Sequence, residues 1–213
     1  MIYVLSGQDA VHFPKLMEQV YKLRYQIFVK EMGWTDLERG DGLEIDQFDY
    51  PEAIHHICVR NGAVVGYQRM LPTTMPNLLS DVFPNLCEGA LPLGPNIYEL
   101  TRYGVAAAYR EGRRGLSTVG SELMAGCVEW GLENGVNKVV IEFETIWVLR
   151  LLQLKFMARP LGFETQIGRQ KIVATELTFN PNTLRAIREY RGTFEKVTSY
   201  IGADAKENLR IAV

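Results

Sequence analysis

Hydrophobic and polar positions recur along the chain with two different periods, which predicts a mixture of helices and strands. Apolar residues between Phe13 and Glu31 return every three or four positions and predict a helix. The segments 53–60 and 63–71 predict two strands, because the Asn61-Gly62 pair between them is a strong hairpin signal. The other predicted strands are 2–6, 97–106, 138–144 and 171–179, and the other predicted helices are 77–83, 116–134, 146–157 and 181–194.

The order of these elements predicts an α/β fold. A hairpin comes early, and strands alternate with helices later, which indicates a mixed sheet covered by helices on both faces. The chain has 213 residues, no internal repeat and no Ser/Pro-rich linker. We therefore predict one domain over residues 1–213.

Composition excludes several classes of protein. The net charge of −2 is too balanced for bulk nucleic-acid binding. No apolar run approaches the roughly 18 residues that a membrane-spanning helix needs, and the N-terminus has no signal-peptide pattern, so we expect a cytoplasmic protein. The three cysteines are odd in number and far apart, which predicts reduced thiols. Adjacent His55 and His56 would face opposite sides of a strand, so no metal site is expected.

Three arginines occupy positions where the pattern predicts a buried face. Arg24 belongs to the apolar stripe of the first helix, one turn from Val20 and Phe28. Arg69 shares a strand face with Val65, Tyr67 and Leu71, and Arg102 lies near Glu99 in another strand. A snorkelling side chain explains a single case. Burying three guanidinium groups costs several kcal/mol unless carboxylates meet them.

The segment GLEIDQFDY supplies three acids, Glu44, Asp46 and Asp49, interspersed with large apolar residues. This pattern predicts an ordered loop whose carboxylates meet the three arginines, with Glu99 nearby. The cluster has two interpretations: it locks the loop to the core, or it forms a binding site. A pocket with both signs of charge suits a zwitterionic ligand, and Trp34 is suited to contact a cation or a flat base, or only to pack against the loop.

The ordered set resembles the signature of the acyl-homoserine-lactone synthases, the autoinducer synthases of bacterial quorum sensing. The resemblance runs from about Met1 to Gly168 and includes the segments RYQIFVKEMGW, DGLEIDQFD, VVGYQRMLPTT, SDVFP and YELTRY. Tyr98 departs from the pattern, since many relatives have Trp before the glutamate. The residues that carry the resemblance are Arg24, Phe28, Trp34, Glu44, Asp46, Asp49, Arg69, Glu99 and Arg102.

The resemblance implies a GNAT-like three-layer αβα sandwich around a mixed, mostly antiparallel twisted sheet. It also implies acylation of the amine of S-adenosylmethionine (SAM) from a thioester on acyl carrier protein or coenzyme A (CoA). Lactonisation then gives an N-acyl-homoserine lactone and methylthioadenosine, without a prosthetic group or metal. Residues 1–60 would serve SAM binding and 100–180 acyl binding, in a monomer or weak dimer.

The resemblance also suggests roles for individual residues. Glu99 would be the general base that takes a proton from the substrate amine; the other interpretation is a core-edge carboxylate that pairs with Arg102. Asp46 and Asp49 would hold the cationic substrate, with Arg24 and Arg69 as their partners. Because Glu99 and Arg102 are three residues apart, a regular strand would point them to opposite faces, so we predict a bulge or splay within 100–104.

Other residues are candidates for binding the acyl group and its carrier. An apolar tunnel behind the sheet would include Phe143, Thr145 and Trp147; its other candidate walls are Leu123, Met124, Ile141, Ile146, Leu151 and Leu152. Each of these residues is more typical of plain core than of a specificity residue. The segment with Arg110, Arg113 and Arg114 would hold phosphates of phosphopantetheine or CoA; the other interpretation is an exposed basic turn. Together with Arg150, Lys155 and Arg159, the segment could also form a basic surface that binds an acidic carrier protein.

Two rival functions, and one alternative catalytic pair, can be weighed on the sequence. A GNAT-type N-acetyltransferase using acetyl-CoA would share the fold but would have no reason for the arginine–carboxylate pattern. A binding module without turnover would have no reason for an intact Glu99. Cys58 and His56 share a strand face and could form a thiol–base pair, although buried cysteines are usually inert.

Overall fold

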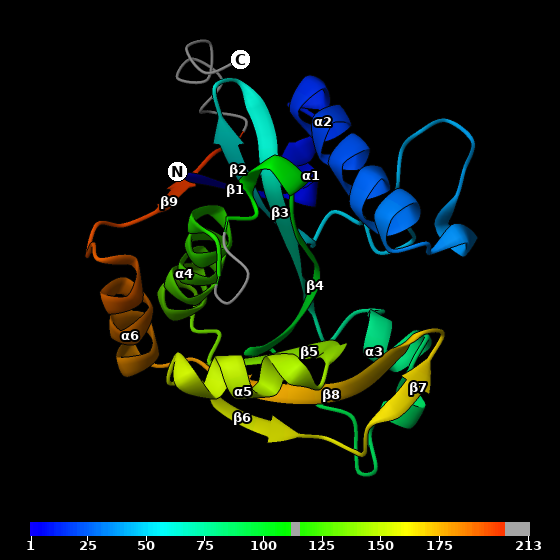
Figure 1. Cartoon of the computed structure of the whole chain (residues 1–213), viewed down its shortest axis with the longest axis vertical. Helices are drawn as coiled ribbons and strands as arrows, with labels where there is room; N and C mark the ends of the chain where they lie inside the picture. The colour runs from blue at the N-terminus through cyan, green and yellow to red at the C-terminus, as the bar shows by residue number, and fades with distance from the viewer. Residues whose placement is uncertain (112–115, 203–213) are drawn as a thin grey trace. The chain divides into compact units, whose positions relative to one another are not determined.

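The computed structural model describes residues 1–111 and 116–202, and the chain folds into two compact units (Figure 1). Unit 1 comprises Met1–Arg69, Arg102–Gly126 and Val197–Val213, and unit 2 comprises Met70–Thr101 and Cys127–Lys196. Each unit is therefore assembled from segments that are distant in the sequence. The prediction of a single domain over 1–213 stays a prediction.

Unit 1 contains a mixed set of strands in the order β4-β3-β2-β1-β9, of which β3 and β4 continue into unit 2. Strand β1 pairs antiparallel with β2 and parallel with β9. The elements with residues in this unit are β1 (Ile2–Ser6), α1 (Gly7–Ala10), α2 (Pro14–Arg24), the π-helical turn η1 (Tyr25–Glu31), η2 (Thr35–Leu37), β2 (Ile54–Arg60), β3 (Ala63–Pro72), β4 (Ile97–Val105), η4 (Ala107–Tyr109), α4 (Thr118–Glu133) and β9 (Thr198–Tyr200).

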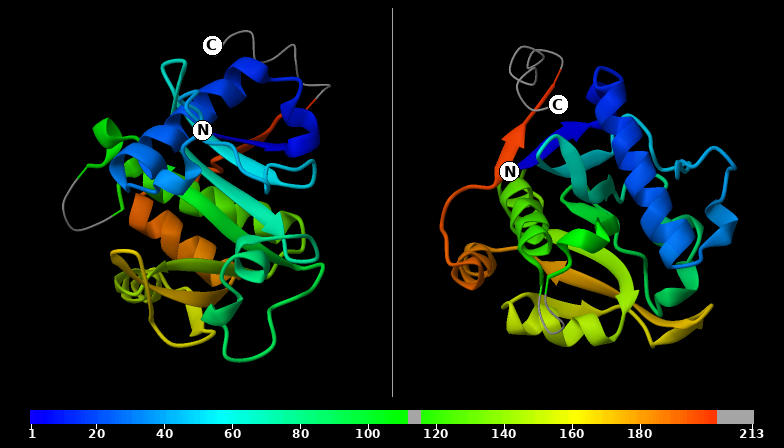
Figure 2. Two further views of the ribbon diagram at one scale, coloured as in Figure 1. Left: turned by 90° about the vertical axis from the view of Figure 1, so that its right-hand side faces the viewer. Right: turned by 45° about the horizontal axis from the view of Figure 1, so that its top comes forward.

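Helices cover both faces of the strands in unit 1 (Figure 2). Tyr67 belongs to the apolar core that includes the buried stripe of α2. A Cβ added to the next residue along, Gly66, would project from the opposite face of β3 and lie 2.6 Å from Val119 of α4. Since successive residues of a strand face opposite sides, α2 and the first part of α4 cover opposite faces. Glycine at position 66 permits the close approach of α4.

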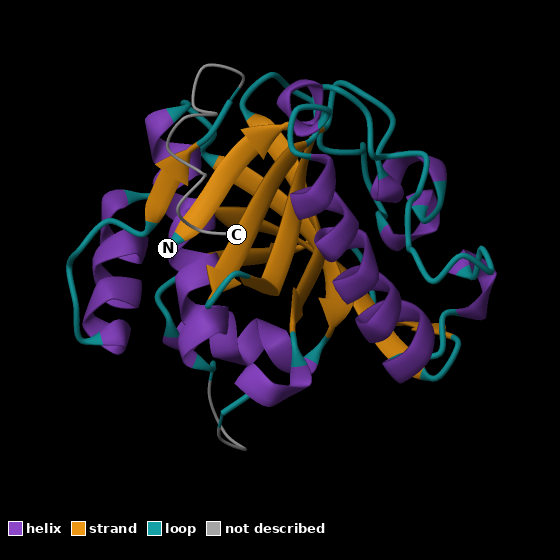
Figure 3. Cartoon of the chain, turned by 90° about the horizontal axis from the view of Figure 1, so that it is seen from above, coloured by secondary structure: helices purple, strands orange, loops and turns teal. Residues whose placement is uncertain are grey.

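Unit 2 contains the strand order β6-β8-β5-β4-β3, with β7 also paired to β8. Strand β5 pairs parallel with β4 and antiparallel with β8. Besides its parts of β3, β4 and α4, the unit contains α3 (Leu78–Asp81), η3 (Pro84–Leu86), β5 (Lys138–Glu144), α5 (Ile146–Gln153), β6 (Met157–Pro160), β7 (Thr165–Ile167), β8 (Gln170–Thr178) and α6 (Pro181–Arg191), coloured by type in Figure 3.

Helices also cover both faces of the strands in unit 2. The Tyr98 ring packs edge-on against Trp130 of α4, with 5.0 Å between the ring centroids. The next residue, Glu99, faces the other side and meets the start of α3. Around α3 lies an apolar core that includes Leu79, Val140 and Ala174.

The predicted α/β fold class with a mixed sheet is confirmed, and the structure refines three details. The helix predicted over 13–31 is α2 followed by a π-helical turn at Tyr25. The helix predicted over 146–157 ends at Gln153, because Lys155 adopts a left-handed conformation with φ of 63° and strand β6 follows. The short strands β6, β7 and β9 were missed, since three or four residues are too few to show a period.

Among the described residues, no helix is both long and apolar enough to cross a membrane.

Candidate active site

The six charged residues singled out in the first helix, the acidic loop and strands β3 and β4 meet in unit 1. We call this set the arginine–carboxylate cluster; it comprises Arg24, Arg69, Arg102, Glu44, Asp46 and Asp49. Arg24, Arg69 and Glu44 are fully buried, and the other three side chains are no more than 6% exposed. A buried, hydrogen-bonded cluster replaces the snorkelling side chains that a lone Arg on an apolar face would adopt.

Each arginine binds two or more carboxylates. The Nε of Arg24 donates to Glu44 at 2.5 Å, and its Nη1 donates to Asp49 at 2.7 Å. Arg69 binds both oxygens of Asp46, at 2.7 and 2.9 Å, and also donates to Asp49 at 2.6 Å. Arg102 donates to Glu44 at 3.1 and 3.2 Å and to Asp46 at 2.7 Å. These charge-assisted contacts offset the cost of burying the guanidinium groups.

The acidic loop holds its carboxylates through its own backbone. The amide of Asp46 donates to Asp49, and the amide of Phe48 donates to Asp46, each at 2.9 Å. The Phe48 side chain is buried and lies under the Arg69 guanidinium. The amide of Glu44 donates to the carbonyl of Tyr21 in α2. The apolar residues of the loop thus anchor it, while its acids turn toward the arginines.

All three carboxyl groups are held as anions. Burial alone would raise the pKa of Asp49, but the Arg24 and Arg69 guanidinium groups outweigh it and hold that pKa well below its usual range. Burial opposes and the arginines likewise lower the pKa of Glu44 and of Asp46. Three positive and three negative charges therefore cancel within the cluster, so it is a neutral frame rather than an acidic pocket.

The exposed edge of the cluster is aromatic. Trp34 stacks on Phe28 with ring centroids 5.2 Å apart, and the Arg102 guanidinium lies 5.5 Å from the Phe28 ring and 5.9 Å from the Trp34 ring. Phe28 is buried, whereas Trp34 is 36% exposed. Two backbone hydrogen bonds end the π-helical turn that contains Phe28 and set this geometry. The amide of Met32 donates to the carbonyl of Ile27, and the amide of Trp34 donates to the carbonyl of Phe28. The open ring face of Trp34 can accept a cation or a flat base.

Arg102 reaches the cluster through an irregular backbone. Its φ is 55°, in the left-handed region that non-glycine residues rarely occupy. The irregularity lies within 100–104, where a bulge or splay was predicted. Among the described residues, the pairing of β4 with β5 runs from Ile97↔Lys138 to Glu99↔Val140, three pairs in all.

Glu99 belongs to unit 2 and is fully buried. Its two oxygens accept the backbone amides of Leu78 at 2.8 Å and of Leu79 at 2.6 Å. These amides begin α3, which Asn77 and Ser80 cap reciprocally. The two amides hold the Glu99 carboxyl group in one orientation at the start of α3.

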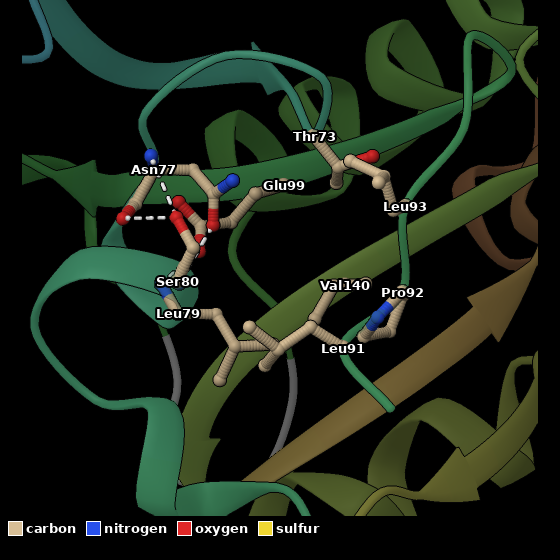
Figure 4. Close-up of a pocket in the computed structure, with 9 residues that line it drawn as sticks. All are labelled: Thr73, Asn77, Leu79, Ser80, Leu91, Pro92, Leu93, Glu99 and Val140. Atoms are coloured by element: carbon tan, nitrogen blue, oxygen red, sulfur yellow. Dashed lines mark hydrogen bonds between the residues drawn. The ribbon is translucent and has the colours of Figure 1, made fainter. Parts of the chain in front are cut away.

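Beside Glu99 lies a cavity of about 140 Å³. Figure 4 shows Glu99 next to Asn77 on one side of it, with Leu79, Leu91 and Val140 on another. The hydroxyl and amide groups of its lining form hydrogen bonds with the protein itself, so the space offers an apolar surface with one carboxylate.

The residues proposed for the acyl tunnel have mixed positions. Phe143 is an odd number of positions from Val140 along β5, so it faces away from the side of Glu99. Thr145 precedes α5, and the ring of Trp147 lies 4.7 Å from the Arg150 guanidinium. Ile146 and Leu152 are 57% and 47% exposed, which is not what an enclosed tunnel wall predicts.

The basic segment, the cysteines and possible metal ligands were also considered from the sequence. Arg110 pairs with Glu31 at 2.7 Å, whereas Arg113 and Arg114 lie outside the described residues. The Cys58 thiol contacts Glu122 at 3.8 Å, and burial raises its pKa to about 11, so a thiol–base pair with His56 is wrong. In the part of the chain that the structure describes, no three or more His, Cys, Asp or Glu side chains are arranged so that they could hold a metal ion.

Two features of these units escaped the sequence reasoning. Glu142 lies on the same face of β5 as Val140, and its Oε1 is buried without a hydrogen-bond partner. Because side chains alternate between the two faces of a strand, the sequence 138–144 already places Glu142 on the same face as Val140, so this residue could have been identified from the sequence. His55 and Tyr67 form a buried hydrogen bond in unit 1, for which the sequence has no comparable signal.

Comparison with known proteins decides the family. The model of the family described as autoinducer synthase matches residues 10–187. The chain belongs to the autoinducer synthase family. It is 32% identical over 193 residues to the isovaleryl-homoserine lactone synthase of Bradyrhizobium diazoefficiens, covering 90% of this chain and 86% of that protein. It is 29% identical over 178 residues to an acyl-homoserine-lactone synthase of Pseudomonas aeruginosa, covering 81% of this chain and 87% of that protein.

Solved structures agree with this assignment. A CoA-dependent acyl-homoserine lactone synthase solved with SAM and isopentyl-CoA has a TM-score of 0.87 and 29% identity to this autoinducer synthase, covering 99% of both chains. An N-acetyltransferase from Lactobacillus plantarum, 16% identical with a TM-score of 0.55, covers 84% of this chain and 99% of its own. That second likeness confirms the expected GNAT-like fold and carries no further weight.

Proposed function

We propose that this autoinducer synthase acylates the amine of SAM with a short, branched acyl group from CoA and closes the product to an N-acyl-homoserine lactone. Family membership supports the lactone chemistry. Likeness to a CoA-dependent synthase supports the donor, and likeness to an isovaleryl-homoserine lactone synthase supports the acyl class. The observation that carries the proposal is the neutral, buried arginine–carboxylate cluster with Trp34 at its exposed edge.

The cluster supports binding of SAM, which carries a carboxylate, an ammonium and a sulfonium. The exposed ring of Trp34 provides a surface for the sulfonium or the adenine. Arg102 and Asp46 are among the slightly exposed members and offer one charge of each sign. The buried Arg24 and Arg69 fix the carboxylates rather than contact the ligand. Because the cluster has no net charge, it would recognise a zwitterion through the placement of its individual positive and negative groups and not through overall attraction.

Glu99 is the proposed general base. It removes a proton from the substrate ammonium, and the free amine attacks the thioester carbonyl carbon. The C–N bond forms as the carbonyl electrons move to oxygen, and the tetrahedral intermediate then collapses as the C–S bond breaks. The nitrogen gives up its second proton to the departing sulfur, so that the amide forms and CoA leaves as a thiol. The SAM carboxylate next attacks its own γ-carbon, and methylthioadenosine leaves from the sulfonium. Folding the methionine chain brings these two atoms together.

The test uses purified protein with SAM and a panel of thioesters. The panel contains isovaleryl-CoA, acetyl-CoA, octanoyl-CoA and isovaleryl-acyl carrier protein, and mass spectrometry measures the lactone while methylthioadenosine release is followed separately. We expect the highest kcat/KM with isovaleryl-CoA. A preference for the carrier-protein thioester would contradict the CoA assignment. Absence of lactone with every donor would contradict the function as a whole.

Two variants test the residue roles. Glu99→Gln should abolish lactone formation while soluble protein is still produced. Arg69→Ala should abolish it together with a loss of stability, which thermal unfolding measures, because Asp46 and Asp49 lose their buried cation. The matched control is Glu18→Gln, which removes one partner of an exposed ion pair with Lys22 and should leave turnover unchanged. Near-normal turnover by Glu99→Gln would show that another group is the base.

A further inference from the structure

His55 and Tyr67 form a polar pair inside an otherwise apolar core of unit 1. The Nδ1 atom of His55 lies 2.7 Å from the Tyr67 hydroxyl, and both residues are 1% exposed. The apolar neighbours in that core include Leu5 and Ile57. Because the hydrogen bond between them is made, the two buried polar groups satisfy each other, and the bond fixes the Tyr67 hydroxyl relative to His55.

Tyr67 contacts the arginine–carboxylate cluster directly. The Arg24 guanidinium lies 5.6 Å from the centroid of the Tyr67 ring and 5.5 Å from that of the Tyr21 ring. Arg24 is thus in cation–π contact with two tyrosines while its Nε and Nη1 bind Glu44 and Asp49. Its Nη2 has no hydrogen-bond partner and lies 3.6 Å from Asp46, so the rings help to fix the plane of the guanidinium.

The pair is uncharged. Burial lowers the pKa of His55 to about 3, and burial raises the pKa of Tyr67 above its usual range. A neutral pair next to Arg24 leaves the balance of three positive and three negative charges undisturbed. A charged group at either position would compete with Asp49 or with Arg69 for partners.

We propose that His55 is a positioning residue for SAM binding: through the Tyr67 hydroxyl it fixes the Tyr67 ring, which fixes Arg24 and hence the carboxylates of Asp49 and Glu44. The inference rests on the proposed function, because it assigns the cluster to SAM. His55 contacts neither substrate nor reacting atoms in this role. Its effect is on the affinity for SAM and not on the acyl donor or on the chemical step.

The experiment compares three variants with the full-length wild-type protein. His55→Leu removes the ring nitrogen. His55→Asn places an amide near the position of Nδ1 and keeps a hydrogen bond to Tyr67 within reach. Tyr67→Phe keeps the ring beneath Arg24 and removes only the hydroxyl. Calorimetry with SAM alone gives the Kd, steady-state kinetics give KM and kcat for both substrates, and thermal unfolding reports folding.

We expect His55→Leu and Tyr67→Phe to raise the Kd and KM for SAM about five- to tenfold, the size of one lost buried hydrogen bond. The kcat and the KM for the acyl donor should stay within twofold of wild type. His55→Asn should recover at least half of the lost affinity. This split separates positioning from stability alone, since a purely structural pair would lower Tm without changing the affinity of the folded protein.

Two results would overturn the inference. One is a Kd for SAM within twofold of wild type for both His55→Leu and Tyr67→Phe. The other is an equal loss with His55→Asn and His55→Leu, which would assign the effect to packing. Failure of the proposed function is a different observation, because wild-type protein would then not bind SAM in the same calorimetric experiment.

Discussion

Arg24 and Arg69 donate to the same carboxylate oxygen, Oδ1 of Asp49, at 2.7 and 2.6 Å. The two guanidinium groups come from a helix and a strand, and both are fully buried. Two positive charges this close repel each other, and an anion that contacts both of them compensates for this repulsion. Asp49 therefore holds together two elements that carry the proposed SAM site.

Asp49→Asn should strongly destabilise the protein. The amide preserves shape but removes the charge that both arginines share, so two buried cations lose part of their compensation. Breaking a buried pair of this kind costs about 3–5 kcal/mol of the free energy of unfolding. Urea unfolding followed by circular dichroism measures the loss, with Glu18→Gln as an exposed control. A loss below about 1 kcal/mol would show that the cluster contributes little to stability.

Trp34→Ala should weaken SAM binding. The exposed ring of Trp34 stacks on Phe28 and lies near Arg102, so alanine removes the proposed surface for the sulfonium or adenine. A lost cation–π or stacking contact of about 0.5–2 kcal/mol corresponds to a rise in KM for SAM of about two- to thirtyfold. Trp34→Phe keeps an aromatic face and should recover most of the affinity. Steady-state kinetics at saturating acyl donor measure both, and an unchanged KM for Trp34→Ala would remove Trp34 from the site.

The cluster could be predicted from sequence because charge in an apolar pattern demands compensation. Arg24 and Arg69 were out of place in a helix stripe and a strand face, and the only nearby concentration of acids with apolar neighbours was the loop containing Asp46 and Asp49. Because an uncompensated charge is very unfavourable in a low-dielectric core, pairing of the arginines with these acids was the arrangement to expect. The structure brings these groups together at hydrogen-bonding distance.

The partners of Glu99 could not be predicted in the same way. Its oxygens accept the backbone amides of Leu78 and Leu79, and every residue except proline has such an amide. The π-helical turn before Trp34 is another case, since one extra residue per turn leaves an apolar period almost unchanged over seven residues. The left-handed backbone of Arg102 depends on tertiary contacts with Glu44 and Asp46.

Glu142→Gln should stabilise the protein increasingly as pH rises. Burial first, and the charge of Glu99 second, raise the pKa of Glu142 well above its usual value. Below about pH 4, the carboxyl is neutral in both the folded and the unfolded chain. Above that pH the unfolded chain releases this proton while the folded chain retains it, so wild-type stability falls through the window up to the raised pKa.

Because glutamine does not titrate, the difference in free energy of unfolding between Glu142→Gln and wild type should grow by up to about 1.4 kcal/mol per pH unit within that window. Urea unfolding at pH 4.5, 6 and 7.5 measures the difference. Burial is the first cause, so added salt should change the slope little. Parallel stability curves for the two proteins would show that Glu142 has an ordinary environment in the folded state.

Gly7→Ala should both destabilise the protein and weaken SAM binding. A Cβ at Gly7 would lie 2.1 Å from the carbonyl oxygen of Tyr50, a backbone atom next to Asp49. The loop would have to move away from the start of α1 and take Asp49 with it, at a cost of about 1–3 kcal/mol in the free energy of unfolding. Gly89→Ala is the matched control, since a Cβ there meets no atom within 4 Å. Unfolding curves and the KM for SAM measure both effects; a destabilised variant with an unchanged KM would show that the position of Asp49 does not set the affinity.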